Sequence, residues 1–181
     1  MQELIAHQET INRQLARYGV KFGIYKNGEF KERLFPFDPL PRVIPAAEFA
    51  VLDALCHAVH SLLRYQPGAT GIYTTAEEAL AGGRGVCQDY AHVFIALARL
   101  AGWHARYCMG LTVGEGATHA WAEIYYEGAW HGFDPTRDCR TDASYLRFAT
   151  GRDAADCPVE QGTFYGLADQ TQTVFMRVKE I

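Results

Sequence analysis

The segment GGRGVCQDYAH, residues 82–92, joins a glycine-rich stretch to the start of an apolar helical pattern. Apolar residues recur in steps of three and four from Val86 to Leu100, which predicts a helix that begins at Cys87 and ends before Gly102. A thiol on the first turn would face the positive end of the helix dipole and unpaired backbone N–H groups, and both favour the thiolate. The segment therefore predicts a nucleophilic cysteine at a helix start.

A histidine and an aspartate follow in two separate short segments, ATHAW at 117–121 and GFDP at 132–135. His119 begins a predicted strand, which returns through a turn at Glu127-Gly128 and a second strand. A short hairpin with this spacing places Asp134 beside His119. Since cysteine, histidine and aspartate can act as nucleophile, base and orienting group, the predicted catalytic residues are Cys87, His119 and Asp134.

Each of these residues also has a purely structural interpretation. A cysteine on a helix is most often a small buried hydrophobic residue. His119 alone could be a hydrogen-bonded strand histidine, and Asp134 before a proline could be a turn residue. The backbone N–H of Cys87 is the predicted oxyanion donor, and the choice of a second donor stays open among Gln88, Tyr73 and Tyr65.

The composition is that of an ordinary globular protein, with 49% hydrophobic and 21% charged residues. A length of 181 residues fits one domain, or one domain with an appendage. The net charge of −4 and the isoelectric point near 6.0 argue against nucleic acid or an anionic membrane as the main partner.

The chain starts without the basic and apolar regions of a signal peptide, and it contains no apolar run of transmembrane length. Its five cysteines are scattered and form no CxxC pair: Cys56, Cys87, Cys108, Cys139 and Cys157. This pattern is unlike a disulfide framework or a zinc site, and it predicts a reducing, cytoplasmic location. The absence of an HExxH motif argues against a metal-dependent hydrolase, so no metal and no cofactor are predicted.

The remaining patterns predict an α+β fold, in which a helix block packs on consecutive antiparallel strands. Helices are predicted over 46–65, over 87–100, near 142–148, and from a capping box at Thr75–Glu78 through Leu80. Strands are predicted over 104–113, 119–126, 129–133 and 172–181, with residues 114–116 as a loop. Residues 1–48 form a predicted N-terminal arm, with a helix over 2–18, a possible hairpin at Asn27-Gly28 and an extended proline-rich segment; residues 49–181 form the predicted catalytic domain.

Three motifs, GVCQDYAH at 85–92, ATHAW at 117–121 and GFDPT at 132–136, resemble those of the transglutaminase-like superfamily. More narrowly, they are similar to its bacterial branch, whose members are often described as cysteine proteases. The resemblance covers roughly residues 50–181, and it implies a papain-like fold with Cys87, His119 and Asp134 as a catalytic triad. It also implies acyl transfer at a peptide, isopeptide or glutamine-type amide through a cysteine thioester, with water or an amine as acceptor.

The N-terminal arm departs from that family pattern. Residues 11–49, including FPFDPLPRVIP at 35–45, resemble instead the leading segment of circularly permuted ATP-grasp proteins, without any ATP-grasp catalytic residues. Three interpretations of the arm stay open, namely a fusion remnant, a chimeric junction and a docking arm for a protein partner, and nucleotide binding is not predicted. The alternative to an enzyme is a non-catalytic peptide-binding module that uses the same cleft; the sequence does not predict an oligomeric state.

Overall fold

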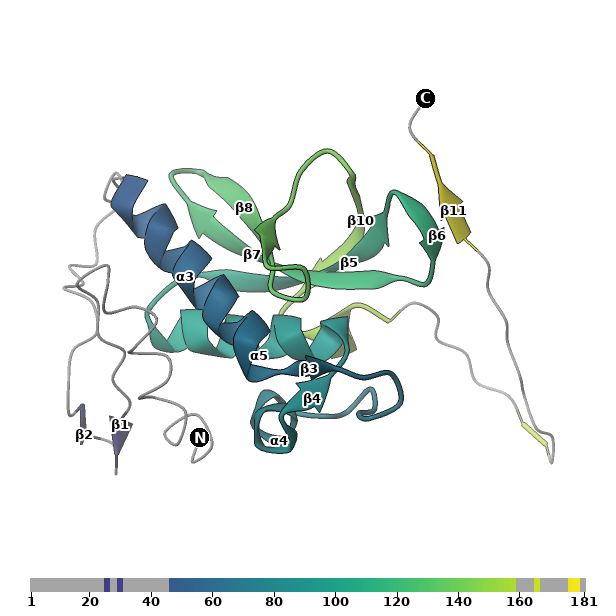
Figure 1. Cartoon of the computed structure of the whole chain (residues 1–181), viewed down its shortest axis with the longest axis horizontal. Helices are drawn as coiled ribbons and strands as arrows, with labels where there is room; N and C mark the ends of the chain where they lie inside the picture. Colours follow the sequence, from purple (N-terminus) through teal and green to yellow (C-terminus); the bar gives the residue numbers. More distant parts are fainter. Residues whose placement is uncertain (1–24, 27–28, 31–45, 159–164, 167–175, 180–181) are drawn as a thin grey trace.

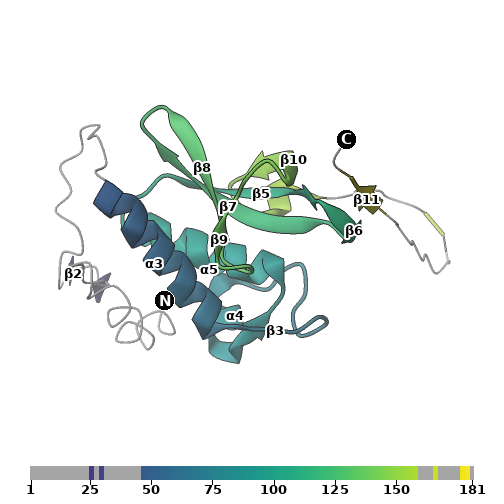
Figure 2. The ribbon, with the colours of Figure 1, turned by 45° about the horizontal axis from the view of Figure 1, so that its top comes forward.

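The computed structural model describes residues 25–26, 29–30, 46–158, 165–166 and 176–179. Its centre is a five-stranded antiparallel sheet in the order β10-β5-β7-β8-β9 (Figure 1). The strands are β5 (Ala105–Thr112), β7 (His119–Tyr126), β8 (Ala129–Asp134), β9 (Cys139–Arg140) and β10 (Tyr145–Gly151). Three helices, α3 (Ala46–Leu62), α4 (Ala76–Gly82) and α5 (Cys87–Leu100), complete the α+β fold that the sequence predicts. Helix α5 packs against the sheet, while α3 and α4 pack against α5 (Figure 2).

Helix α5 begins and ends at the predicted residues. Asp89 caps its first turn, because one carboxylate oxygen accepts hydrogen bonds from the Val86 N–H at 2.7 Å and from the Thr70 hydroxyl at 2.6 Å. A Cβ on Gly85 would lie 2.6 Å from that carboxylate, so the glycine gives Asp89 room to fold back. The cap fixes the backbone directly before Cys87.

The helix predicted over 46–65 ends three residues early, at Leu62. Arg64–Tyr65 form strand β3 and pair in parallel with strand β4, Arg84–Gly85. Their backbone donors are satisfied there, from Arg64 N to Gly83 O at 3.0 Å and from Gln66 N to Gly85 O at 2.8 Å. The extended pairing replaces the last helical turn and ties the end of α3 to the segment before Cys87. The predicted capping box at Thr75 and Glu78 is confirmed at the start of α4.

The β7–β8 hairpin has the predicted turn. Glu127 and Gly128 have φ values of 46° and 82°, the left-handed pair that a two-residue hairpin turn requires. Alternation along β7 places Ala120, Ala122 and Ile124 in the core that includes α5. The other side of the strand therefore carries His119, Trp121, Glu123 and Tyr125.

The helix predicted near 142–148 is wrong. Residues Tyr145–Gly151 form the edge strand β10, which pairs with β5 from Thr112 to Tyr107. Gly110 of β5 permits the close approach, because a Cβ there would overlap the Leu146 carbonyl oxygen. Backbone pairing with a distant strand thus overrides the local pattern.

The predictions for residues 114–116 and 172–181 have different outcomes, since the first is wrong and the second is confirmed for the residues described. Residues 114–116, predicted as a loop, form strand β6 (Gly114–Gly116). Strand β6 pairs with β11 (Met176–Val178), which is the described part of the predicted closing strand. The two strands make a small antiparallel sheet of their own.

At the N-terminus, the strands β1 (Tyr25–Lys26) and β2 (Glu29–Phe30) pair antiparallel, whereas the predicted turn residues Asn27 and Gly28 lie outside the described residues. The predicted helix over 2–18, the proline-rich segment and most of the ATP-grasp-like stretch lie outside the described residues. Helix α3 runs across the predicted boundary at 48/49, and that boundary stays a prediction. Among the helices of the described ranges, none has the length and apolar character needed to cross a bilayer.

Candidate active site

Cys87 is the first residue of α5 and is partly exposed, unlike most cysteines of the chain. Cys56, Cys108 and Cys157 are buried, and burial raises the pKa of each of these three thiols. Cys139 is exposed on β9. A helix N-terminus stabilises an anion, so Cys87 has the setting that a reactive thiol needs.

His119 and Asp134 are brought together by the β7–β8 hairpin. The imidazole Nε2 of His119 lies 2.6 Å from Oδ2 of Asp134. Asp134 is fully buried at the end of β8. Its other oxygen, Oδ1, accepts hydrogen bonds from the backbone N–H groups of Thr136 at 2.9 Å and Arg137 at 3.2 Å. The carboxylate is therefore held by the chain that follows it while it holds the histidine.

The electrostatics of the pair favour a charged imidazole. Burial by itself lowers the pKa of His119, but hydrogen bonds with Asp134 and Cys87 and the negative charges of both groups outweigh it and raise the pKa to about 9. Burial by itself raises the pKa of Asp134, but the hydrogen bond and the charge of His119 outweigh it and lower that pKa below its usual range. Because Nε2 faces Asp134, Nδ1 is the nitrogen left to face Cys87.

The segment after Asp134 is fixed to one stripe of helix α3. Arg140 makes a bidentate pair with Asp53 at 2.7 and 2.6 Å. The rings of His57 and His60 reach the same segment, at Asp138 Oδ2 (2.6 Å) and at the Pro135 carbonyl oxygen (3.2 Å). These contacts brace the loop that carries the Asp134 hydrogen bonds.

One residue of the site was missed by the sequence reasoning. The hydroxyl of Tyr145, at the start of β10, donates a hydrogen bond to Asp134 Oδ2 at 2.8 Å. A local pattern could not reveal this contact, because the pattern at 142–148 favours a helix, whereas β10 is placed by its pairing with β5. Trp121 is buried and stacks beside His119 with ring centroids 6.4 Å apart.

The predicted second oxyanion donor stays open. The Gln88 side chain donates to the Ile72 carbonyl oxygen at 3.1 Å. Tyr73 is 88% exposed and Tyr65 is 52% exposed. Burial, followed by the charge of Cys87, raises the pKa of Tyr65, so its phenol lies within electrostatic reach of the sulfur. Of the three side chains, Tyr65 is the one with this electrostatic connection.

Two further histidines, His92 and His131, have structural surroundings. His92 accepts a hydrogen bond from Ala154 N at 3.2 Å and packs on Tyr107. Burial lowers the pKa of His92, which favours its neutral form. His131 packs on Phe49 with ring centroids 4.9 Å apart. Over the described residues, no group of three or more His, Cys, Asp or Glu side chains is arranged to hold a metal ion.

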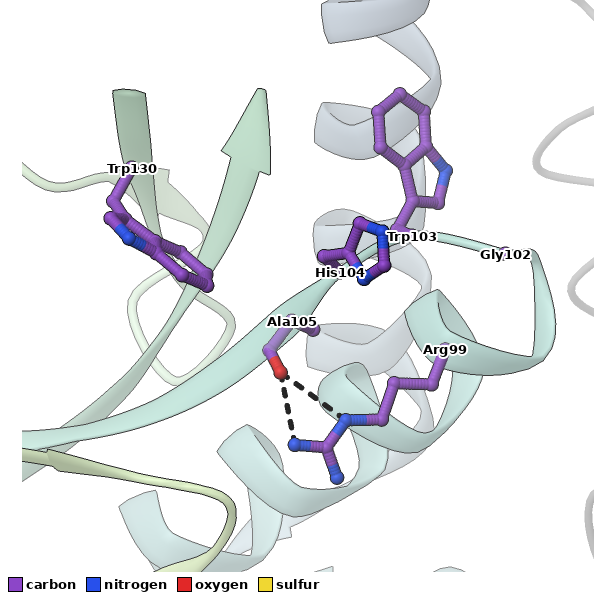
Figure 3. A pocket seen from close by; sticks show the side chains of 6 residues that line it. All are labelled: Arg99, Gly102, Trp103, His104, Ala105 and Trp130. Carbon is purple, nitrogen blue, oxygen red and sulfur yellow. Dashed lines mark hydrogen bonds between the residues drawn. The ribbon is translucent and has the colours of Figure 1, made fainter. Parts of the chain in front are cut away.

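A separate hollow of about 470 Å³ lies at the opposite end of α5. Figure 3 shows its lining, which combines two tryptophans, a histidine and an arginine: Arg99, Gly102, Trp103, His104, Ala105 and Trp130. Arg99 donates two hydrogen bonds to the Ala105 carbonyl oxygen, at 3.2 and 2.9 Å (Figure 3). The hollow contains none of the three predicted catalytic residues.

Relatives among curated proteins cover the same region. An uncharacterized protein of Mycobacterium leprae (strain TN) is 34% identical over 139 residues, which are 71% of this chain and 46% of that protein. An uncharacterized protein of Mycobacterium tuberculosis is 35% identical over 131 residues, 64% of this chain and 42% of that one. The chain thus spans less than half the length of these relatives.

A solved structure has the same fold. A protein from Cytophaga hutchinsonii, described as a candidate cysteine protease, is 34% identical, with a TM-score of 0.57 over 61% of this chain and 39% of that one. The family model described as the transglutaminase-like superfamily matches residues 44–135, just over half of the chain. That match includes Cys87, His119 and Asp134. The chain belongs to the transglutaminase-like superfamily.

Proposed function

We propose that this protein is a thiol-dependent enzyme that transfers or hydrolyses the acyl group of a peptide, isopeptide or glutamine-type amide. The observation that carries the proposal is the 2.6 Å pair of His119 and buried Asp134, electrostatically coupled to Cys87 on the first turn of α5. A histidine with only a structural role in the strand could stay neutral, and it would not need a buried carboxylate as its hydrogen-bond partner. The raised pKa of His119 supports an imidazolium that stabilises a thiolate.

The reaction begins with the Cys87 thiolate, which attacks the amide carbonyl carbon and forms a carbon–sulfur bond. The carbonyl oxygen takes up the negative charge, and the Cys87 N–H at the helix start is placed to stabilise it. Collapse of this intermediate breaks the carbon–nitrogen bond, and the His119 imidazolium gives its proton to the departing amine. The product is a thioester on Cys87.

The second half of the reaction regenerates the enzyme. Water or a primary amine attacks the thioester while His119 accepts its proton, and the carbon–sulfur bond breaks to return the thiolate. Asp134 does not exchange the proton; it orients the ring through Nε2 and stabilises the imidazolium. The access of water to the thioester decides between hydrolysis and amine transfer.

The comparisons support the general kind of enzyme. The relative from Cytophaga hutchinsonii is described as a candidate cysteine protease, and the superfamily assignment points to the same covalent chemistry. Members of one fold family act on different substrates, so the amide class is our proposal from the site.

The test has two parts. Iodoacetamide should label Cys87 faster than the other four thiols of the native protein, as shown by peptide mass mapping. A glutamine peptide offered with and without a primary amine should then give an amine adduct, a hydrolysed product, or both. Equal labelling of all five cysteines would overturn the proposal. Tight peptide binding without turnover, unchanged in Cys87→Ser, would instead favour a binding module.

A further inference from the structure

Tyr145 has a placement that the reaction steps above do not use. It is the first residue of the edge strand β10, opposite Thr112 of β5. Its hydroxyl lies 2.8 Å from Asp134 Oδ2, the same oxygen that holds His119. Its ring packs edge-on against Trp121, with centroids 5.3 Å apart, and lies 6.2 Å from the His119 ring. These contacts aim the phenol at the carboxylate.

The hydrogen bonds on Asp134 are complete when Tyr145 is included. A carboxylate has about four acceptor positions. Two backbone N–H groups occupy Oδ1, and the donors from His119 and Tyr145 share Oδ2. Since Asp134 has no exposed surface, bulk water cannot replace a donor that is lost. The two hydrogen-bond donors on Oδ2 therefore share the charge of one oxygen, with the Arg137 Nε 3.9 Å from it.

We propose that Tyr145 is a positioning residue, whose hydroxyl shares Asp134 Oδ2 and thereby sets how strongly that oxygen holds the His119 N–H. The inference deepens the proposed function and rests on it, because this bond decides how readily His119 gives its proton to the departing amine. A carboxylate without the phenol would hold the imidazolium more tightly, and proton transfer to the leaving group would be slower.

The surroundings keep the phenol a donor. Burial, the hydrogen bond with Cys139 and the charge of Asp134 all raise the pKa of Tyr145, so its hydroxyl keeps its proton across the working pH range. The other titratable or charged groups around the pair are few. They come from α5, from α3 and from the segment after β8: Cys87, Cys56, His60, Arg137 and Cys139.

The test is Tyr145→Phe, with nuclear magnetic resonance of the His119 ring followed against pH. Loss of the phenol should move the His119 titration upward by roughly half to one pH unit, since one hydrogen bond to a charged group is removed. Where turnover can be measured, kcat should fall by roughly threefold to tenfold with KM unchanged. A packing role alone would lower the melting temperature without moving the titration.

Tyr125→Phe is the matched control. Tyr125 is a partly exposed phenol on β7 that packs on Trp130, away from Asp134, and its removal should leave the His119 titration unchanged. An unchanged or lowered titration in folded Tyr145→Phe would overturn the proposal.

A second measurement uses the unaltered protein, in case the variant does not fold. Carbon-13 labelling of the tyrosine Cζ atoms should show the Tyr145 signal changing at the pH where His119 titrates, because both groups donate to one oxygen. A signal that stays flat through that pH contradicts the inference. Neither readout needs turnover: a reactive Cys87 with no Tyr145 effect defeats only this inference, and an unreactive Cys87 defeats the proposed function.

Discussion

The two ends of helix α5 carry different marks of a functional site, a surface hollow at one end and a group of reactive side-chain types at the other. The C-terminal end borders a hollow of about 470 Å³ with two tryptophans, yet it holds no nucleophile (Figure 3). The N-terminal end carries Cys87, which is electrostatically coupled to His119, and His119 pairs with the buried Asp134, whose two carboxylate oxygens are both hydrogen-bonded. The 14 residues of α5 separate these ends by about 20 Å.

The helix dipole favours the N-terminal end for the proposed chemistry. A thiolate there meets unpaired N–H groups, whereas an anion at the C-terminal end would face carbonyl oxygens. At that end, Arg99 lies on the last turn of α5 and supplies the positive charge that the dipole favours there. Its guanidinium donates a hydrogen bond to the Ala105 carbonyl oxygen. The comparison teaches that charge and hydrogen bonding, rather than empty volume, locate the candidate site.

Replacing the nucleophile should have the largest effect. In Cys87→Ala, turnover should fall by roughly 10⁴-fold or more, because no other group can form the thioester. The pKa of His119 should also fall, since its hydrogen bond and charge interaction with the sulfur are lost. Turnover assays and ring titration by magnetic resonance measure the two effects.

The control for the proposed nucleophile is Cys157→Ala, which removes a buried thiol that has no contact with His119 or Asp134. This control should keep its turnover even if it melts earlier, whereas Cys87→Ala should melt within a few degrees of the parent, because Cys87 is not a buried core residue. Residual turnover in Cys87→Ala above a few per cent of the parent would show that the thiol is not the nucleophile.

Asp134→Asn should have the next largest effect, a loss in kcat of roughly 10³- to 10⁴-fold. The amide carries no charge to stabilise the imidazolium, and its N–H₂ group would favour the wrong tautomer of His119. The pKa of His119 should drop accordingly. Asp156→Asn is the control, since Asp156 accepts a hydrogen bond from the Arg152 backbone N–H on the surface and does not contact His119. Equal activities of the two variants would contradict an orienting role for Asp134.

The parts of this site that the sequence predicts are those built from local signals. Cys87 is placed by a glycine stretch and a helix start, and Asp89 caps that helix three residues from Val86. His119 and Asp134 are 15 residues apart and joined by one tight turn, so the hairpin alone decides their meeting. The contact between His119 and Asp134 can be predicted from the sequence because it depends only on this hairpin and on no other helix or strand.

The missed parts depend on partners that are distant in sequence. Tyr145 reaches Asp134 because β10 pairs with β5, some 35 residues earlier in the chain. Likewise, Arg64–Tyr65 leave the helical pattern because they pair with Arg84–Gly85. Such pairing is decided when the whole sheet assembles, so the periodicity of apolar residues in a short stretch of sequence does not reveal it.

The pH dependence sharpens the comparison, since it tests the histidine–aspartate pair at the N-terminal end. The pKa of His119 is raised from 6.5 to about 9, so the stability from its ion pair is fully present below pH 6.5 and is lost as pH rises through 9. The pKa of Asp134 is lowered, so its stabilising effect is lost only as pH falls through that depressed value.

Activity should fall above pH 9 by roughly tenfold per pH unit, as measured by kcat/KM. In Trp130→Ala, the same limb should be unmoved, and in Asp134→Asn it should move to lower pH.

Trp130→Ala should have the smallest effect on activity, within roughly threefold of the parent kcat/KM. Trp130 is 38% exposed, with the Arg106 guanidinium 3.9 Å from its ring centre and Tyr125 packed beside it. Removing the ring should therefore cost about 1–2 kcal/mol of unfolding free energy, less than a buried tryptophan would. Urea denaturation and steady-state kinetics separate these two outcomes. A tenfold rise in KM with unchanged stability would mean that the hollow binds part of the substrate, and the two ends of α5 would then belong to one extended site.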